Sequence, residues 1–300
     1  MDINMIDELN DVLEERGEEF RARVHITVKP HALLKGICLE KEGNKVAPTV
    51  YLEGHEEDTV EEYATFCQKA YHANSSMKED MTMNIDKWVT AEYINGNVLP
   101  RLTHQDNLDR LNRNDTYYIR MLDLVVFFYI PVCKTENGYE GTITITNPLI
   151  KSAGINAPDL YETAVKNLEK SVEIKSMYET LNEMMPGVLD DDEDDEPVDD
   201  AMLPRMYVAT NESKVNGASV ILTQRFKDII KTLFGDKAII IPSSRHEVIV
   251  VDYSDQTAKE TAKMIQEVNR TEVSAEDILS DHPYFLINGD IYQHDLTATH

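Results

Sequence analysis

The chain has 300 residues, of which 29 are Lys or Arg and 55 are Asp or Glu, so its formal net charge is -26. With 42% hydrophobic residues, 12 Gly, 11 Pro and 3 Cys, the composition excludes a collagenous, a disulfide-rich or a wholly disordered chain. The negative charge opposes direct binding to nucleic-acid phosphates or to anionic membranes, because clustered Lys and Arg side chains drive both interactions. It permits a basic protein surface as a partner.

The N-terminal half shows patterns typical of helices and hairpins. Residues 3–20 carry apolar side chains at helical spacing with acids between them, which predicts an amphipathic helix. Thr59, with Glu62 three positions later, forms a capping box and predicts the start of a helix that ends near residue 73. An Asn-Gly pair at residues 137–138 indicates a type I′ turn between two strands. The other elements predicted here are strands at residues 23–28, 34–40, 48–52, 123–133 and 141–146, and helices at residues 158–170 and 174–185.

A run of acids separates the two halves. Residues 189–200 contain nine acids and no base, and charges this dense repel one another without an apolar face to offset the ordering entropy. We therefore predict a flexible acidic linker over residues 188–202, between an N-terminal domain of residues 1–187 and a C-terminal domain of residues 203–300. The first domain carries a net charge of -13 and the last carries -4, so the excess of acid lies in the N-terminal half.

The C-terminal half continues in the same style. An Asn-Gly pair at residues 216–217 predicts a turn between strands at residues 206–210 and 218–222. Apolar residues at helical spacing predict a helix over residues 224–234. Hairpins and helices without sustained βαβ alternation indicate an α+β fold, with mainly antiparallel sheets, flanking helices and two subdomains joined by the acidic linker. The remaining predictions are strands at residues 238–241, 248–253, 285–287 and 291–293, and helices at residues 257–269 and 274–280.

Targeting and redox features favour a cytoplasmic protein. Residues 1–8 are acidic and lack the basic and apolar regions of a secretory signal. The longest apolar run, residues 124–133, is about half the length that a membrane-spanning helix needs. Cys38, Cys67 and Cys133 are far apart and lie among apolar neighbours, which favours three buried, reduced thiols. We therefore expect no membrane segment.

One candidate catalytic pattern comprises Asp159, Glu173 and Lys175. It is similar to the acid, acid and lysine pattern of metal-dependent nucleases, in which two acids hold Mg²⁺ and the lysine positions the attacking water. Asp159, however, follows Pro158 at the predicted start of a helix, where an acid complements the helix dipole. The negative net charge also opposes a DNA substrate. The structural interpretation is therefore favoured.

A second candidate lies between two predicted strands, where Ser244, His246 and Glu247 suggest a hydrolase. Successive side chains of an extended chain point to opposite sides, so Ser244 and His246 share a side that Glu247 does not. A polar connection is therefore favoured, with Ser243, Ser244, Arg245 and His246 as candidate binding residues, because polar loops on rigid strands often carry binding. The sequence has neither the ligand spacing of a metal site nor a phosphate-binding glycine loop, so we expect no metal and no cofactor.

Six short sequence motifs are distributed over the two halves of the chain. They are residues 41–52, 120–129, 206–211, 241–248, 267–270 and 279–282. Together they resemble an uncharacterised family of proteins from anaerobic Gram-positive bacteria, catalogued as a domain of unknown function. The resemblance covers most of the chain apart from the acidic run and the termini. It implies a cytoplasmic bacterial protein in which both halves form one unit, and it implies no activity, cofactor or site residue.

These observations favour a non-enzymatic binding protein whose acidic N-terminal half recognises a basic protein surface, with electrostatic steering as the main source of recognition. One alternative is an acidic mimic of nucleic acid, in which the predicted helix at residues 3–20 fills the DNA- or RNA-binding groove of another protein. The other alternative is an enzyme, either a hydrolase or a metal-dependent nuclease, that uses one of the two candidate patterns. The sequence does not indicate an oligomeric state.

Overall fold

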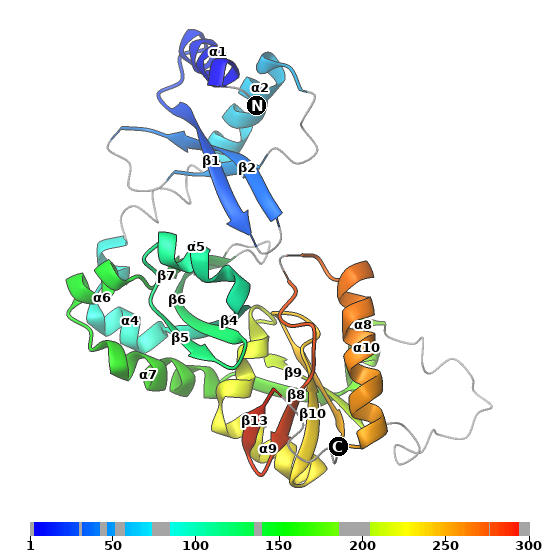
Figure 1. The fold of residues 1–300 in the computed structure, drawn as a ribbon. Helices are drawn as coiled ribbons and strands as arrows, with labels where there is room; N and C mark the ends of the chain where they lie inside the picture. Colours follow the sequence, from blue (N-terminus) through cyan, green and yellow to red (C-terminus); the bar gives the residue numbers. More distant parts are fainter. Residues whose placement is uncertain are drawn as a thin grey trace. The chain divides into compact units, whose positions relative to one another are not determined.

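The computed structural model describes residues 3–29, 32–42, 47–51, 58–73, 85–134, 140–185, 205–275 and 277–293 (Figure 1). The chain forms two compact units. Unit 1 comprises Met1–Tyr93 and Val132–Gly141, and unit 2 comprises Ile94–Pro131 and Thr142–His300. The predicted acidic linker at residues 188–202 and the predicted turn at residues 137–138 lie outside the described residues.

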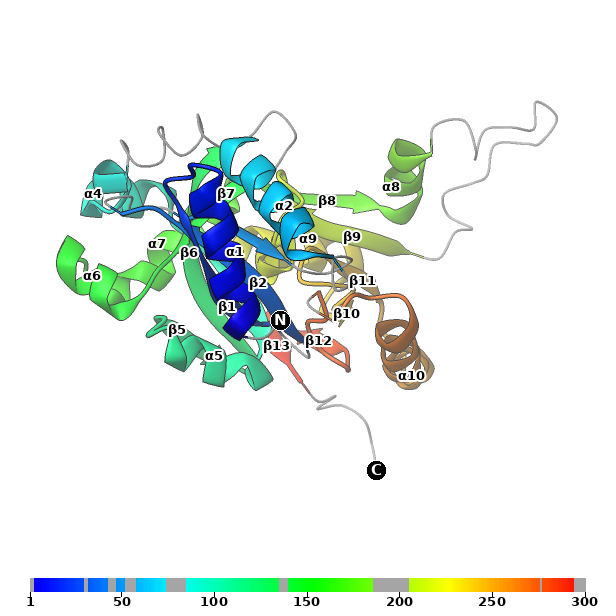
Figure 2. The same ribbon diagram turned by 90° about the horizontal axis from the view of Figure 1, so that it is seen from above.

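Unit 1 is built around two helices packed on one face of an antiparallel sheet. The helices are α1 (Ile3–Glu15) and α2 (Val60–Ala73), which lie side by side across the strands (Figure 2). The sheet has the order β1-β2-β3, with β1 (Arg21–Lys29), β2 (Ala32–Glu40) and β3 (Thr49–Tyr51). The predicted strands of this region and the hairpin between the last two are therefore confirmed.

The core of unit 1 comes from the apolar stripe of α1 and from alternate strand positions. Leu9 and Leu13 of α1 are buried against Ile37 of β2 in one apolar cluster. The helix predicted over residues 3–20 ends early, at Glu15, because Gly17 adopts a φ of 77°, which a helix does not allow.

The capping box predicted at the start of α2 is present. The Thr59 backbone N–H donates to Oε2 of Glu62 at 2.8 Å, and the Glu62 N–H donates to Oγ1 of Thr59 at 3.3 Å. The two reciprocal bonds satisfy backbone donors that would otherwise lack partners at the helix start. Local sequence thus determines where this helix begins.

Unit 2 contains two antiparallel sheets. The larger has the order β13-β12-β10-β11-β9-β8, and the smaller has the order β4-β6-β5, with β7 paired to β6. The larger sheet is built from β8 (Val172–Ser176), β9 (Met206–Asn211), β10 (Lys237–Ile241), β11 (Val248–Asp252), β12 (Tyr284–Ile287) and β13 (Asp290–Tyr292). The smaller sheet is built from β4 (Leu99–His104), β5 (Tyr118–Met121), β6 (Leu124–Lys134) and β7 (Glu140–Thr144). Residues 132–134 at the end of β6 and residues 140–141 at the start of β7 are assigned to unit 1.

Helices cover both faces of the larger sheet. Ile265 of α10 lies in one apolar cluster with Ile239 of β10 and Phe285 of β12, whereas Ile240, the next residue of β10, points to the opposite face of the sheet and is also buried. Helix α9 contacts β10 and β11 (Figure 1). The helical elements are α4 (Ala91–Asn97), η1 (Gln105–Asn107), α5 (Leu108–Arg113), α6 (Asn147–Ala153), α7 (Ala157–Glu169), α8 (Met177–Met184), η3 (Gly217–Leu222), α9 (Gln224–Phe234) and α10 (Asp255–Thr271). The prediction of an α+β fold with mainly antiparallel sheets is confirmed.

The division into units differs from the predicted domains of residues 1–187 and 203–300. Strand β8 precedes the acidic run and β9 follows it, yet the two strands pair in antiparallel register from Val172 to Ser176. Residues on both sides of the run therefore belong to one sheet of unit 2. Hydrogen bonding between strands, which composition does not reveal, accounts for the difference.

Two predicted elements have a different form. Residues 218–222 belong to the 3₁₀ helix η3 instead of a strand, because Asn216 turns the chain with a φ of 54° and Gly217 packs closely against Thr210. Residues 174–185, predicted as one helix, divide between strand β8 and helix α8. Ser176 marks that division, since it forms a capping box with Glu179.

Two further boundaries are corrected near the C-terminus. Helix α10 begins earlier than predicted, because Ser254 supplies the N-cap by accepting a bond from the Thr257 N–H. The predicted helix at residues 274–280 is a turn, in which the Ser274 hydroxyl donates to Oδ2 of Asp277 at 2.6 Å. Within the described part of the chain, no helix has the length and apolar character needed to cross a bilayer.

Candidate functional site

The loop at residues 242–247 holds its polar side chains against neighbouring segments. Nδ1 of His246 accepts a bond from the Asn216 backbone N–H at 3.3 Å, and Nε2 lies 3.3 Å from Oδ1 of Asp277. The Ser244 hydroxyl oxygen accepts from the His246 backbone N–H at 3.0 Å. The His246 ring is thus directed at Asn216 and Asp277, and the arrangement gives no support to a hydrolase in which it activates Ser244 beside Glu247.

Arg245 anchors the same loop. Its Nε lies 2.7 Å from Oδ1 of Asp277, and its backbone N–H donates to the Asp277 carbonyl oxygen at 2.8 Å. The side chains of Arg245 and His246 remain partly exposed. Binding through residues 243–246 therefore stays a prediction.

The residues of the nuclease pattern lie on two elements, α7 and β8. Asp159 lies in the first turn of α7 and accepts a bond from Nδ2 of Asn156 at 2.8 Å. Glu173 and Lys175 lie on β8, beyond the opposite end of a helix that rises about 15 Å between Asp159 and its last residue. Lys175 is 3.9 Å from Glu173 and 2.7 Å from Glu183 of α8. The structure brings Glu173 and Lys175 together and leaves Asp159 apart from them.

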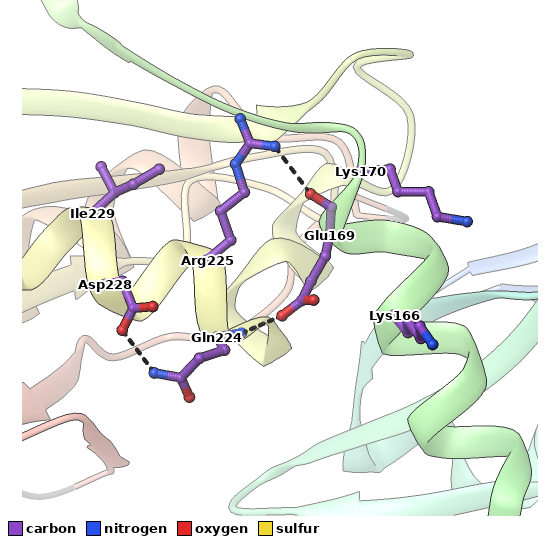
Figure 3. Close-up of a pocket in the computed structure, with 7 residues that line it drawn as sticks. All are labelled: Lys166, Glu169, Lys170, Gln224, Arg225, Asp228 and Ile229. Carbon is purple, nitrogen blue, oxygen red and sulfur yellow. Dashed lines mark hydrogen bonds between the residues drawn. The ribbon is translucent and has the colours of Figure 1, made fainter.

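An open hollow of about 700 Å³ lies between α7 and α9 (Figure 3). Glu169 accepts a bond from the Gln224 backbone N–H at 3.0 Å, and Asp228 accepts from Nε2 of Gln224 at 2.8 Å. The hollow is wide open to solvent, and six of its seven lining residues are polar or charged, unlike the mostly apolar clefts that usually bind small ligands. Its lining consists of Lys166, Glu169, Lys170, Gln224, Arg225, Asp228 and Ile229.

A buried carboxylate in unit 2 gathers ionisable side chains from three segments. Asp123 is 3% exposed and lies in the tight turn that joins β5 to β6. His104 ends β4, while Ser280 and His282 precede β12 and Tyr284 begins it. We call Asp123, His104, Ser280, His282 and Tyr284 the Asp123 centre. It connects the two sheets of this unit.

Four side chains approach the Asp123 carboxylate. The Tyr284 hydroxyl donates to Oδ1 at 2.7 Å, and the Ser280 hydroxyl donates to Oδ2 at 3.1 Å. Nε2 of His282 lies 3.0 Å from Oδ2, and Nε2 of His104 lies 3.4 Å from the same atom. Because both imidazole rings face one oxygen, their charges depend on each other and on Asp123.

The second nitrogen of each histidine ring also has neighbours. Nδ1 of His104 lies 3.3 Å from the Asp106 backbone nitrogen, from which it accepts a bond when the ring is neutral, and 3.1 Å from Oδ2 of Asp106, to which it can donate when the ring is protonated. Nδ1 of His282 lies 3.4 Å from both the Ser280 hydroxyl and the Pro283 carbonyl oxygen. Both rings are partly exposed, at 23% and 32% of the side-chain surface, so protons can exchange with solvent.

Charge and burial shift the pKa of every ionisable group in the Asp123 centre. Burial alone would raise the pKa of Asp123, but bonds from His104, His282 and Tyr284 outweigh it and hold that pKa far below its usual value. The bond to Asp123 raises the pKa of each histidine despite partial burial. Burial and the Asp123 charge raise the pKa of the Tyr284 phenol. The carboxylate therefore stays ionised, and the histidines bind protons more tightly than free imidazole.

The Asp123 centre was not among the sequence candidates, because its other members lie 19 to 161 positions from Asp123 along the chain. One signal was available: Asp123 is a charged residue at the start of an otherwise apolar run, and a buried acid needs partners. Its neighbour Leu122 adopts a φ of 59°, which is uncommon for a bulky side chain.

The arrangement can hold protons and does not supply a nucleophile. Ser280 is buried, and its hydroxyl is already bonded to Asp123. Within the described ranges, no group of three or more His, Cys, Asp or Glu residues is placed to hold a metal ion. The geometry thus supports a proton-linked contact between the two sheets.

The fold and site define an α+β protein with a buried ionised centre in its larger unit. The chain belongs to DUF5688, a family of unknown function, which matches residues 4–286. Comparisons with curated proteins and with solved structures give no match. The family match covers parts of both units and includes every residue of the Asp123 centre. It ends at residue 286, one residue before the end of β12.

Proposed function

We propose that this protein acts by binding a basic surface of another protein through the outward face of α1. The observation that carries the proposal is the one-sided distribution of charge on this helix, whose 13 residues include no Lys or Arg. Apolar residues line its inner face, and acids occupy its exposed positions. These exposed acids are Asp7, Glu8, Asp11, Glu14 and Glu15.

Packing in unit 1 supports the proposal because it keeps the acidic face in one orientation. Leu9 and Leu13 are buried in the same apolar cluster as Tyr63 of α2. Fixed charges of one sign steer an oppositely charged partner and suppress binding of like-charged ones. Arg21 approaches Glu14 at 3.4 Å, but this pair is well exposed and contributes little to neutralisation.

The dimensions of α1 favour a protein patch over nucleic-acid mimicry. From Asp7 to Glu15 the helix rises about 12 Å. Duplex DNA carries one charge per about 1.7 Å of its axis, so this acidic face matches the length of about four base pairs. A groove that binds nucleic acid would require a longer stripe, whereas a local basic patch would not.

Charge neutralisation on α1 tests the proposal. The combined variant Asp7→Asn, Asp11→Asn and Glu15→Gln is titrated calorimetrically with a helical peptide that carries lysines four residues apart. We expect wild-type affinity to fall as NaCl rises from 50 to 150 mM, and the variant to bind about tenfold more weakly, a loss of about 1.4 kcal/mol.

A matched control separates the helix face from net charge alone. The combined variant Glu162→Gln, Glu267→Gln and Asp290→Asn removes three exposed acids from unit 2. It should bind the peptide like the wild type, and circular dichroism should show both variants folded. An equal loss of peptide affinity in the two variants, or a wild-type affinity that does not change with NaCl concentration, would contradict the proposal.

A further inference from the structure

We propose that residues 277–283 form a strap in unit 2 that is held at one end at every physiological pH and at the other end only while histidines of the Asp123 centre carry protons. The strap begins at Asp277, beside the loop at residues 242–247, and leads into β12. It includes Ser280 and His282, which contact Asp123. The proposal concerns a conformational device and is independent of partner binding through α1.

The Asp277 end of the strap does not depend on histidine protonation. Nε of Arg245 lies 2.7 Å from Oδ1 of Asp277, and the Arg245 backbone N–H donates to the Asp277 carbonyl oxygen at 2.8 Å. A guanidinium group keeps its charge throughout the physiological pH range. Nε2 of His246 accepts a bond from Nε of Arg245 at 3.1 Å and lies 3.3 Å from Oδ1 of Asp277, but the backbone bond between Arg245 and Asp277 involves no group that titrates.

The other end depends on charge. A protonated His282 forms an ion pair with a buried carboxylate at 3.0 Å. A neutral His282 can still donate a hydrogen bond to the ionised carboxylate, but the attraction between opposite charges is lost, so the contact is weaker. His104 approaches the same oxygen from β4, so deprotonation of the two rings removes the cationic neighbours of Asp123. The raised pKa of both histidines places this loss on the alkaline side of the ordinary imidazole value of 6.5.

Further ionisable and polar groups face these rings. Asp106 of η1 adds negative charge beside His104, and Nε2 of Gln293 lies 2.9 Å from Nε2 of His282. Asp281 accepts a bond from Nδ2 of Asn269 on α10 at 2.9 Å, which keeps that amide attached to the strap at either charge state. Tyr284 stays protonated across the range, because its pKa is raised. The two histidines are thus the groups of the centre whose charge changes near neutral pH.

Backbone strain favours opening once these contacts weaken. Leu122, directly before Asp123, has a φ of 59° and is 41% exposed. A left-handed conformation costs free energy for a residue with a Cβ atom, and it persists only when surrounding contacts hold it. The bonds to Asp123 supply such contacts, so loss of the ionic ones loosens the turn and the strap together.

Hydrogen exchange of the full-length chain, read by mass spectrometry at pH 5.5 and pH 8.0, tests the proposal. After correction for the pH dependence of chemical exchange, we expect amides at residues 278–282 and 120–124 to lose at least tenfold protection at pH 8.0. Amides of α9 should not change. Equal protection of the strap at the two pH values would overturn the proposal.

Variants identify the groups responsible. His104→Gln combined with His282→Gln should abolish the pH dependence at the strap, because glutamine donates a bond and does not titrate. The matched control His72→Gln removes a partly exposed histidine that pairs with Glu18 in unit 1, and it should leave the dependence intact. Persistence of the dependence in the double variant would refute the assignment.

A third variant separates the loss of a hydrogen bond from the loss of histidine charge, so the proposal can be tested even if the double variant folds poorly. Tyr284→Phe removes a bond of 2.7 Å to Asp123 without removing a group that titrates near neutral pH. It should reduce protection of the strap at both pH values and leave the ratio of protection at pH 5.5 to protection at pH 8.0 unchanged. A loss of the ratio in this variant would show that hydrogen-bond number, and not histidine charge, controls the strap, which would also overturn the proposal.

Discussion

Tyr284 donates a hydrogen bond of 2.7 Å from its hydroxyl group to Oδ1 of Asp123, across 161 positions of sequence. Both side chains are buried, Tyr284 at 1% exposure. The bond joins the first residue of β12, in the larger sheet, to the turn between β5 and β6, in the smaller sheet. A buried carboxylate with several donors is costly to disturb, so this contact links the stability of the two sheets.

Removal of the Asp123 charge should therefore destabilise unit 2. We expect Asp123→Asn to lower the free energy of unfolding by about 2–3 kcal/mol, because Tyr284 and Ser280 lose a charged acceptor in a buried place. Urea denaturation at pH 7 measures the change. Asp106→Asn is the control, since that side chain is 64% exposed and its loss should cost less than about 0.5 kcal/mol. Equal effects of the two variants would contradict this role for Asp123.

Global stability should fall as pH rises above 6.5. The folded-state pKa of His104 and of His282 is raised, so their contribution is complete below the ordinary imidazole pKa of 6.5 and is lost as pH rises through the folded value. The pKa of Asp123 is lowered from 3.8, so its contribution is lost only in strong acid. Urea titrations between pH 6 and pH 8.5 should show the decline in the wild type and a flatter profile in the His104→Gln, His282→Gln variant. An unchanged profile would assign the decline to other groups.

Gly217 should tolerate no side chain. A Cβ atom there would lie 2.1 Å from Oγ1 of Thr210 and 2.4 Å from the His246 carbonyl oxygen. We expect Gly217→Ala to lower the free energy of unfolding by about 2–3 kcal/mol, because the backbone must shift to relieve the overlap. Gly96→Ala is the control, since open space surrounds that position in α4, and it should be neutral or stabilising by up to about 1 kcal/mol. Thermal unfolding compares the two, and a mild effect at Gly217 would show that η3 can move.

Cys67 should resist alkylation in the folded protein. It is buried in the core of unit 1, and burial raises the pKa of its thiol to about 12, so little thiolate exists at pH 8. Iodoacetamide followed by peptide mass spectrometry should find Cys38, which is partly exposed, modified before Cys67. Leu13→Ala should accelerate modification of Cys67 by loosening the same core. Native-state labelling of Cys67 at the rate of Cys38 would contradict the observed packing.

Elements with strong local signals were predictable from the sequence. Helix α9 has the predicted limits of residues 224–234, because Thr223 caps its start, an apolar stripe runs along it and Gly235 follows it. The strands predicted at residues 285–287 and 291–293 are joined by a turn at Asn288 and Gly289, an Asn-Gly pair that adopts φ values of 52° and 90°. Such features depend on a few consecutive residues, and those residues carry the same preferences in any fold.

Elements that depend on distant partners were not predictable in this way. The apolar residues 218–222 form η3 because Gly217 packs against Thr210 and the loop containing His246, a contact that no local pattern encodes. The candidate site shows the same limit. The sequence pattern indicated only that Asp123 begins a buried strand, and it did not relate Asp123 to His104 or His282. The fold brings both histidines to the Asp123 carboxylate.

The sequence by itself thus determined the class of fold, most of the helices and hairpins, and the concentration of acid in the N-terminal half, because periodicity, caps and composition act over short stretches. The tertiary structure decided that β8 and β9 pair across the acidic run, that η3 replaces a strand, and that His104, Asp123 and His282 meet. The physical reason is that pairing energies and buried charges depend on separations in space, and chain topology sets these separations.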